Sequence, residues 1–398
     1  MSAVLVINSG SSSFKYQLID MQTEEPLASG LVERIGEGVG RTEHHGPGGA
    51  SEHTLEIPDH TAGFQAMLDA FRADGPSLEE YPPVAVGHRV VHGGARFFEP
   101  TIVTHLVEIN IEDLADLAPL HNPANLQGIR AAEKAFPDIP QVAVFDTAFH
   151  QTLAPEAYTY AIDAGLAERY RVRRYGFHGT SHKYVSEEAA RFLGRPLGGL
   201  KQIVLHLGNG ASACAIDGGR SVDTSMGMTP LEGLVMGTRS GDIDPAVLLH
   251  LSRRARLGTE ELDELLNRRS GLLGLSGRGD MRDVRQAAEA GDPASGLALA
   301  TYLHRLKHYI GAYVAVLGGL DVLTFTAGVG ENDARVRGGA LDGLEGLGIV
   351  LDPERNAVGS REARIISTDD SRVTVLVVPT NEELEIARQT LAAVAGAG

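Results

Sequence analysis

An internal duplication constrains the fold of this chain more than any other feature. Residues 4–17 read V-L-V-I-N-S-G-S-S-S-F-K-Y-Q, and residues 203–216 read I-V-L-H-L-G-N-G-A-S-A-C-A-I. Each segment has a short apolar stretch, a tight turn of Gly, Ser and Asn, and a second stretch that alternates, which is typical of a strand–turn–strand unit. Each second stretch runs on to Ile-Asp, at residues 19–20 and 216–217. The repeat predicts two lobes of similar fold.

The turns of the two repeats are suited to binding phosphate. Such a turn presents several backbone N–H groups, and glycine lets them approach an anion closely. Two of these loops, one in each lobe, predict a nucleotide gripped in a cleft between the lobes. That layout is expected of an enzyme or of a nucleotide-dependent switch.

Size and composition narrow the alternatives. The 398 residues, 43% of them hydrophobic, suffice for two or three domains with sizeable cores. A net charge of −17 argues against nucleic acid or an anionic membrane as partner. No stretch approaches the ~20 apolar residues of a membrane span, and no signal peptide precedes the first strand. The single cysteine, Cys214, excludes an internal disulfide, so we expect a cytoplasmic protein with this thiol buried.

The rest of the pattern predicts mixed α/β lobes, because each half begins with strands and continues with alternating helices and strands. The expected strands are 3–8, 13–20, 26–34, 84–91, 142–145, 202–207, 211–217, 220–223, 321–327 and 372–378. The expected helices lie near 60–73, 123–136, 245–256, 259–269, 294–317 and from 381 onward. Residues 36–50 are rich in glycine and are expected to form a surface loop with solvated His44 and His45, and residues 328–330 to form a turn.

Two common nucleotide motifs do not account for the turns. A Walker loop requires Gly-Lys-Ser/Thr, and no lysine of this chain follows a glycine. Residues 208–213 match the looser Gly-x-Gly-x-x-Ala pattern, but the following residues alternate like a strand where a dinucleotide fold needs a helix. Phosphate binding by hairpin turns from two lobes remains, as in the actin-like ATPase and sugar kinase architecture.

Further segments, in order along nearly the whole chain, resemble the acetate kinase family. They are N-S-G-S-S-S at 8–13, G-H-R-V-V-H-G-G at 87–94, P-L-H-N-P at 119–123, F-D-T-A-F-H at 145–150, R-Y-G-F-H-G-T-S-H at 174–182, H-L-G-N-G-A-S at 206–212, M-G-T-R-S-G-D-I-D-P at 236–245, G-V-G-E-N at 328–332 and P-T-N-E-E-L at 379–384. The family usually has a slightly longer Ser-rich turn before the segment D-M-R-D at 280–283. The resemblance implies an α/β, duplicated actin-like ATPase / sugar kinase fold with two lobes around a nucleotide cleft. We expect an N-terminal lobe at 1–150, to which 383–398 return, and a C-terminal nucleotide-binding lobe at 151–382.

The resemblance also implies a reaction, the transfer of the γ-phosphoryl group of ATP to acetate to give acetyl phosphate and ADP. A carboxylate is ionised at neutral pH, so it needs no general base. It needs cations that offset the repulsion between two anions. Arg89 and Arg239 fit that need, and the resemblance places both beside the acid and the transferring phosphoryl group.

Other residues receive roles by the same resemblance. His178 is expected to bind the phosphoryl oxygens with support from His121, for which a core role is the alternative. Asp146 ends a buried strand, where an unpaired carboxylate is costly, and is expected to orient Arg89 or the water shell of the metal. The alkyl group of the acid is expected to meet Val91, Leu120, Phe177 and Pro230.

The nucleotide and its metal ion are assigned in the same way. The ATP contacts are expected at Ser11, Ser13, Lys15, His206, Leu207, Gly208, Asn209, Gly210, Asp280, Met281, Arg282, Gly328, Val329, Gly330, Glu331 and Asn332. Asn8 and Glu382 are expected to contact Mg²⁺, or Mn²⁺ in its place, because Mg²⁺ prefers oxygen ligands and keeps several waters. Structural alternatives are a solvated Lys15, a helix-terminal Glu382 and a helix-capping Asn332.

Rival functions stay open at this stage. A propionate or butyrate kinase would differ in pocket size. A non-catalytic actin-like ATP switch would lack a small-acid pocket with two arginines. A sugar kinase would need a carboxylate base, for which Asp146 could serve. The expected partners are a small carboxylate and ATP, and the resemblance implies a homodimer.

Overall fold

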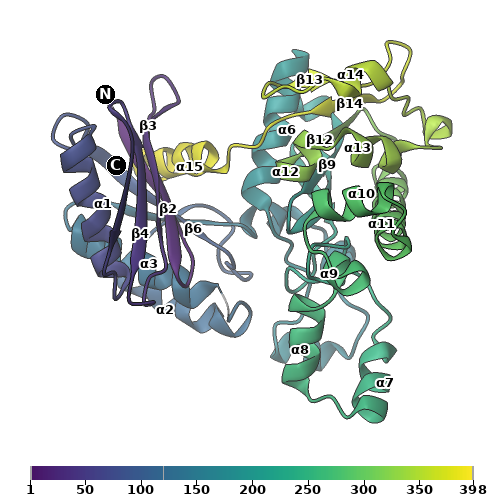
Figure 1. Cartoon of the computed structure of the whole chain (residues 1–398), viewed down its shortest axis with the longest axis horizontal. Coiled ribbons are helices and arrows are strands. Elements are labelled where there is room, and N and C mark those ends of the chain that lie inside the picture. The colour runs from purple at the N-terminus through teal and green to yellow at the C-terminus, as the bar shows by residue number, and fades with distance from the viewer. Residues whose placement is uncertain (1, 120, 397–398) are drawn as a thin grey trace. The chain divides into compact units, whose positions relative to one another are not determined.

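The computed structural model describes residues 2–119 and 121–396 and divides into two units (Figure 1). Unit 1 comprises Met1–Phe149 together with Asn381–Gly398, so both ends of the chain belong to it, and unit 2 comprises His150–Thr380. Along residues 2–119 and 121–396, none of the helices combines the length and the apolar character that crossing a membrane requires.

The two units share one sheet topology, which confirms the duplication. The shared order in unit 1 is β3 (Glu25–Glu33), β2 (Ser13–Asp20), β1 (Ala3–Ser9), β6 (Pro83–Val90) and β8 (Gln141–Phe145). In unit 2 it is β11 (Arg220–Thr224), β10 (Ala211–Asp217), β9 (Lys201–Leu207), β12 (Val322–Thr326) and β14 (Thr374–Val377). In both, the first three strands form an antiparallel meander, and the last two run parallel to the central strand. The fold is the duplicated actin-like kinase fold of the α/β class.

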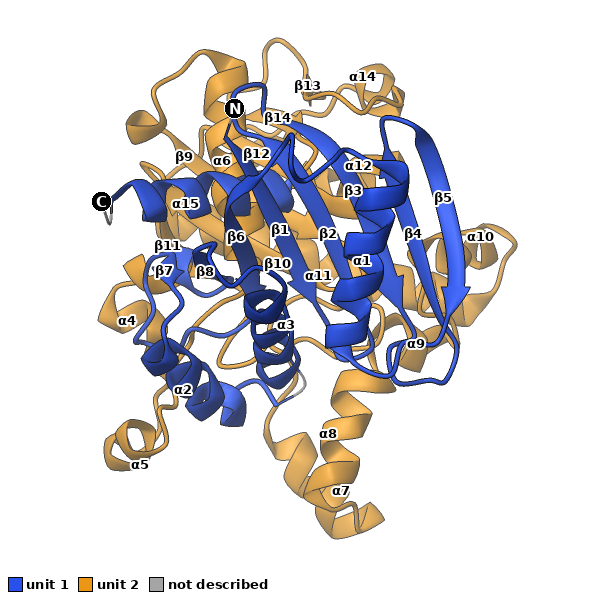
Figure 2. Ribbon diagram, turned by 90° about the vertical axis from the view of Figure 1, so that its left-hand side faces the viewer, with its two compact units in different colours: residues 1–149, 381–398 blue, residues 150–380 orange. Residues whose placement is uncertain are grey.

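Helices pack on the sheets of both units. In unit 1, α1 (His60–Asp74) and α3 (Asn122–Ala135) lie in front of the sheet in Figure 2, and α15 (Glu382–Gly396) packs on β1, β6 and β8. In unit 2, α6 (Gly179–Leu193) packs on β9 and β12. The other helices are α2 (His105–Asp113), α4 (Pro155–Tyr158), α5 (Ala164–Arg169), α7 (Ala246–Ala255), α8 (Thr259–Arg268), α9 (Gly271–Ser276), α10 (Met281–Glu289), α11 (Pro293–Leu317), α12 (Ala327–Asn332), α13 (Ala334–Leu341) and α14 (Pro353–Ala357).

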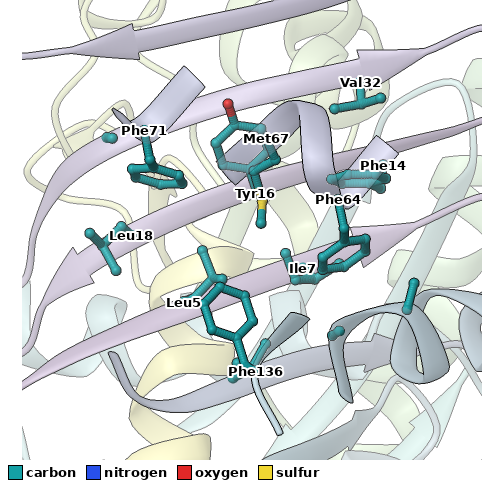
Figure 3. Close-up of a cluster of buried hydrophobic side chains, with 14 of the residues drawn as sticks. Leu5, Ile7, Phe14, Tyr16, Leu18, Val32, Phe64, Met67, Phe71 and Phe136 are labelled. Atoms are coloured by element: carbon teal, nitrogen blue, oxygen red, sulfur yellow. The ribbon is translucent and has the colours of Figure 1, made fainter. Parts of the chain in front are cut away.

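Alternate side chains of the strands point into the core of unit 1. Leu5 and Ile7 of β1 point to the same face as Phe14 and Leu18 of β2, because side chains two positions apart share a face. They pack against α1 side chains such as Phe64 in the cluster drawn in Figure 3. Phe14 and Phe64 stack with ring centroids 4.7 Å apart. This core fixes β1 and β2, and with them the turn between the strands.

The expected surface loop at 36–50 is wrong. β4 (Gly40–Gly46) and β5 (Gly49–Leu55) form a hairpin that extends the sheet beyond β3. His44 is buried, and its two ring nitrogens hydrogen-bond to the Tyr16 hydroxyl and the Gly75 carbonyl at 2.7 Å each, whereas His45 is exposed. An edge hairpin with a largely solvated outer strand needs few apolar residues, so its composition resembled that of a loop. Two short strands, β7 (Thr101–Ile102) and β13 (Arg364–Ile365), complete the sheets.

Candidate active site

The carboxyl edge of the unit 1 sheet holds a buried ion pair. β1, β6 and β8 are parallel to one another, so their carboxyl ends meet there. Arg89 Nε donates to the two carboxylate oxygens of Asp146 at 2.9 and 3.2 Å, and Nη2 donates to Oδ2 at 2.7 Å. The Asp146 side chain is 2% exposed and that of Arg89 21%. This bidentate contact holds the guanidinium in one plane and one direction.

Further charged groups belong to this edge. Burial disfavours the charge of Arg89, but the carboxylates of Asp146 and Glu382 outweigh it and raise the Arg89 pKa. Burial also raises the pKa of Glu382, the first residue of α15; Arg89 and Lys15 oppose the rise, and Asp146 adds to it. Glu383 also contributes to the raised pKa of Arg89, so the edge combines two cations with three carboxylates among the described residues. Asn8 belongs to it as well, because it pairs with Lys15 in the β1–β2 ladder.

The segment after β6 is held by residues that the sequence analysis did not identify. Asn125 of α3 accepts a hydrogen bond from the Val91 amide at 3.0 Å and donates to the Ser9 carbonyl at 2.7 Å. It thus links the end of β6 to the end of β1. Asn122 accepts from the His92 amide at 3.1 Å and donates to the His92 carbonyl at 3.0 Å. Both lie within or just after the P-L-H-N-P segment, which could have indicated them.

Four other expected residues of unit 1 are exposed or half-buried. Ser11 is exposed in the β1–β2 turn, Ser13 is half-buried at the start of β2, and Lys15 is exposed on β2. His121 is exposed immediately before α3. Leu120, expected in the acid pocket, lies outside the described residues.

Unit 2 places His178 at the corresponding carboxyl edge, before α6. Its backbone is left-handed, with φ 56°, a conformation that costs energy and that marks functional positions when the surrounding structure maintains it. Its Nδ1 lies 2.9 Å from the Ser212 hydroxyl, which also lies 2.7 Å from His182 Nε2. The ring stacks on His206, with centroids 4.2 Å apart. Ser181 in turn lies 2.8 Å from His206 Nδ1, so the His178 ring is held through a chain of hydroxyl contacts.

Arg239 and His178 converge on the second hairpin turn. A Cβ atom added to Gly210 would lie 3.1 Å from Arg239 Nη2 and 3.6 Å from His178 Nε2. Arg239 Nη1 donates to the Pro230 carbonyl at 2.6 Å. Among the described residues, no carboxylate forms an ion pair with Arg239, and burial lowers its pKa. The turn, a histidine and an uncompensated cation therefore meet at one point, whereas Phe177 is 1% exposed within the core.

A cavity of about 490 Å³ opens beside the same turn, within unit 2. Residues expected to bind ATP line it: Gly208, Asn209, Asp280, Met281, Arg282, Gly328, Val329 and Asn332. Its lining also contains residues that the sequence analysis missed: Gly237, Leu272, Gly279, Arg285, Tyr302 and Asp333. Tyr302 is 2% exposed, and its hydroxyl has no hydrogen-bond partner within the described part of the chain. Cavities of this size, with apolar walls and a few polar groups, commonly bind small molecules.

Two polar residues that were expected to bind ATP, Asp280 and Glu331, also have structural contacts. Asp280 caps α10 and binds Arg282 Nη2 at 2.7 Å, and this contact lowers the Asp280 pKa to about 2. Glu331 accepts hydrogen bonds from the amides of Ala327 and Thr380 at 2.9 and 3.1 Å. The expected turn at 328–330 is wrong, because these residues belong to helix α12. The helix-cap alternative for Asn332 is also wrong, since Asp333 caps α13.

The remaining assigned residues of unit 2 surround the hairpin rather than the cavity. His206 and Leu207 end β9 and are buried, and Gly330 is buried in α12. Cys214 is buried as expected, and burial raises its thiol pKa. No group of three or more His, Cys, Asp or Glu side chains that could hold a metal ion occurs within residues 2–119 and 121–396.

Comparisons with known proteins identify the relatives of this chain. The model of the Acetokinase family matches residues 3–388. Acetate kinase of Leifsonia xyli subsp. xyli is 78% identical over 395 residues, which cover 99% of this chain and 100% of that protein. Among solved structures, an acetate kinase of Porphyromonas gingivalis is 44% identical with a TM-score of 0.94, over 99% of this chain and 100% of that one. A propionate kinase of Francisella tularensis is 42% identical with a TM-score of 0.92, over 98% and 100% of the two chains.

Proposed function

This chain belongs to the acetokinase family, and from that premise we propose that it transfers the γ-phosphoryl group of ATP reversibly to acetate, by direct in-line displacement. The observation that carries the proposal is the meeting of Arg239, His178 and the Gly208–Gly210 turn beside the cavity. A half-buried cation with no carboxylate partner among the described residues is suited to charge that arrives with a substrate.

Unit 2 supplies the nucleotide contacts in this proposal. The base and ribose occupy the cavity, between the apolar side chains of Leu272, Met281 and Val329. The phosphates reach the hairpin turn, where backbone N–H groups approach them and Arg239 offsets their charge. His178 donates a hydrogen bond to a phosphoryl oxygen, with its ring direction set by Ser212.

Unit 1 supplies the arginine whose direction is fixed. Asp146 holds Arg89 by two nitrogens, and the raised pKa keeps the guanidinium charged at any working pH. Arg89 binds the acid substrate, and Val91, one residue beyond the end of β6, contacts its alkyl group. Because acetate is already ionised, no group of this edge has to remove a proton from it.

The donor chemistry of unit 1 fits Mg²⁺. Asn8 and Glu382 offer an amide and a carboxylate oxygen, and burial makes the charge of Glu382 costly in the absence of a cation. Mg²⁺ is commonly held by one or two carboxylates and substrate phosphates, so a cluster of three protein ligands is not required. When bound, the ion neutralises charge on the phosphates.

Two further parts of the proposal rest on the family. We place the reaction in the cytoplasm, where ATP is available, and we propose a homodimer. Sedimentation equilibrium over a tenfold concentration range should give twice the mass of the 398-residue chain. A single species of monomer mass would remove the dimer without affecting the proposed reaction.

Trapping the acyl phosphate with hydroxylamine tests the activity directly. The protein is incubated with MgATP and, separately, with acetate, propionate, butyrate and glucose. Hydroxamate should form fastest with acetate, and Arg239→Ala should lower kcat by about 10³, the scale of a lost arginine in phosphoryl transfer. The exposed Arg254 of α7 provides a matched control, and Arg254→Ala should retain activity. Equal release of ADP with and without an acid would refute the kinase and favour an ATP switch.

A further inference from the structure

We propose that Asp242 is a positioning residue for Arg239, acting through the closed segment 233–242 and its anchor on α11. The inference rests on the proposed role of Arg239 in phosphoryl transfer. Asp242 has a carboxylate close to an essential cation in sequence, yet its contacts are with the backbone and with α11.

Asp242 closes the segment that carries Arg239. Its amide donates to the Gly233 carbonyl at 3.0 Å, and its Oδ1 accepts from the Gly233 amide at 2.8 Å. Gly233 and Gly241 have φ values of 106° and 66°, which side-chain-bearing residues rarely adopt. A Cβ at Gly233 would lie 2.6 Å from the Ser225 carbonyl oxygen. The closed conformation of the segment 233–242 therefore depends on glycine at these two positions.

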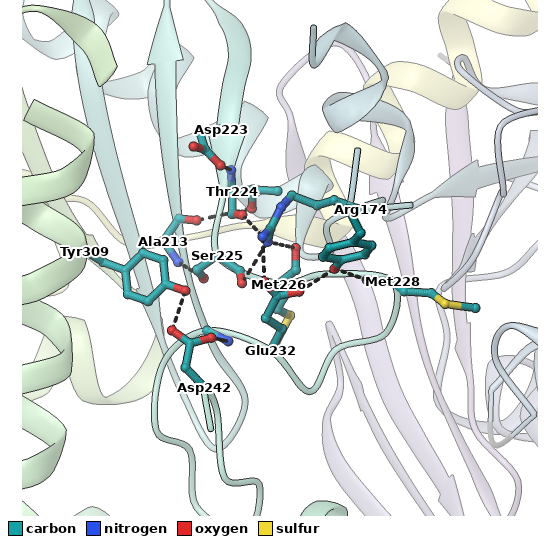
Figure 4. A network of polar contacts seen from close by, with 12 residues as sticks. Arg174, Ala213, Asp223, Thr224, Ser225, Met226, Met228, Glu232, Asp242 and Tyr309 are labelled. Atoms are coloured by element: carbon teal, nitrogen blue, oxygen red, sulfur yellow. Dashed lines mark hydrogen bonds and ion pairs between the residues drawn. The ribbon is translucent and has the colours of Figure 1, made fainter. Parts of the chain in front are cut away.

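The second carboxylate oxygen of Asp242 ties the closed segment to α11. Oδ2 accepts from the Tyr309 hydroxyl at 2.8 Å, a contact visible in Figure 4, and from Arg305 Nη1 at 3.3 Å. α11 is 25 residues long and packs against α9, α10 and β10. Asp242 thereby fixes the closed segment to α11, a long helix of unit 2.

A second anchor fixes the residue that Arg239 contacts. Arg174 Nη1 donates to the carbonyls of Thr224, Ser225 and Met226 at 2.8–3.2 Å, and Nη2 donates to Glu232 at 2.6 Å (Figure 4). The segment with Pro230 lies between these contacts. Both ends of the hydrogen bond from Arg239 to the Pro230 carbonyl are thus held from outside the site.

This indirect arrangement has a chemical reason. Arg89 is positioned by a carboxylate that also neutralises it, whereas Arg239 has no carboxylate ion-pair partner among the described residues. A direct partner would compete with the phosphates for the guanidinium. Asp242 instead acts on the backbone on either side of Arg239, so it can set the position of the cation without lowering its charge.

A double-mutant cycle tests the inference. In the wild-type background, Asp242→Asn should lower kcat about 10-fold, because displacements below 1 Å suffice for such losses. Tyr309→Phe, which removes one hydroxyl from the same anchor, should lower it by a smaller factor. Tyr313→Phe is the matched control, because Tyr313 lies on α11 and its hydroxyl makes no hydrogen bond within the described residues. It should leave kcat unchanged.

The decisive comparison uses the Arg239→Ala background. If Asp242 acts through Arg239, Asp242→Asn should cause no further loss of the residual kcat there, while melting temperatures confirm that all variants fold. If Asp242→Asn lowered kcat by the same factor in the wild-type and Arg239→Ala backgrounds, or left kcat unchanged, the inference would be overturned. The proposed function would stand in both cases, because the wild-type protein would still be an active kinase. Absence of acetyl phosphate from the wild-type reaction, or full activity of Arg239→Ala, would instead refute the proposed function and with it the inference.

Discussion

Replacing Gly210 by alanine tests the geometry at the hairpin turn with one added carbon atom. The backbone of Gly210 is not left-handed, so alanine is compatible with it. The added Cβ would lie 3.1 Å from Arg239 Nη2, closer than the 3.4–4 Å of an ordinary van der Waals contact of a Cβ atom. The cation must therefore move by a few tenths of an ångström, while its Nη1 is tied to the Pro230 carbonyl at 2.6 Å.

The size of the effect follows from that displacement. A 1 Å misplacement of a reacting group can cost about 10²-fold in rate, so a shift of roughly half that size predicts a loss of about 10-fold in kcat. His178 is less affected, because the Cβ would lie at an ordinary contact distance of 3.6 Å from its ring. Melting temperature should stay within the wild-type range, since the turn is half-exposed.

The assay is hydroxamate formation at saturating MgATP and acetate, with Gly296→Ala as control. Gly296 lies on α11, and a Cβ there would meet nothing within 4 Å among the described atoms. The control should retain full activity. A Gly210→Ala protein with wild-type kcat would show that Arg239 does not have to occupy the position seen here.

Three other substitutions have expected outcomes. Asp146→Asn should lower the free energy of unfolding by about 3 kcal/mol, because it leaves the largely buried Arg89 guanidinium without the carboxylate that it contacts directly, and urea titration that shows no change would contradict this pairing. Burial lowers the pKa of His88 to about 4, although the ring hydrogen-bonds to Gln141. Because the unfolded chain takes up this proton near pH 6.5, the free energy of unfolding should fall between about pH 6.5 and about pH 4, by at most ~3 kcal/mol for this site. His88→Gln should therefore make the urea midpoint depend less on pH. Gly311→Ala on α11 should raise stability by about 0.5–1 kcal/mol, as a Cβ there meets nothing within 4 Å of the described structure, and a lower melting temperature would show hidden crowding.

Periodic and repeated segments were predictable because local rules decide them. The six strands of the two meanders follow from alternation and from the repeat itself. α12 was mistaken for a turn because its Gly328 and Gly330 disfavour a helix, and what stabilises its start is Glu331, whose carboxylate accepts the Ala327 amide. Ala327 has φ 64°, a value that its residue type does not suggest.

The residues of the candidate site also differ in how well the sequence could predict them. Arg89, Arg239 and His178 were assigned because each lies in a short segment that resembles the acetate kinase family. Tyr302 was not predictable, since it enters the cavity lining from the middle of a long helix whose spacing only indicates packing. The contact between Asp242 and Tyr309 spans 67 positions and has no local signature, so only the folded chain brings it together.

Arg89 and Arg239 differ in a way that bears on how each can act. Nearby carboxylates raise the pKa of Arg89 against the effect of burial, and one of them, Asp146, contacts two of its nitrogens. The charge of Arg89 is therefore largely offset, and its main contribution is the fixed direction of its guanidinium. Arg239 has a pKa lowered by burial and a single carbonyl partner among its described contacts, so its net charge is what it contributes. Lysine preserves charge but not the planar fork. Arg89→Lys should therefore lose more of its function than Arg239→Lys, and the reverse order in kcat/KM would contradict this division of roles.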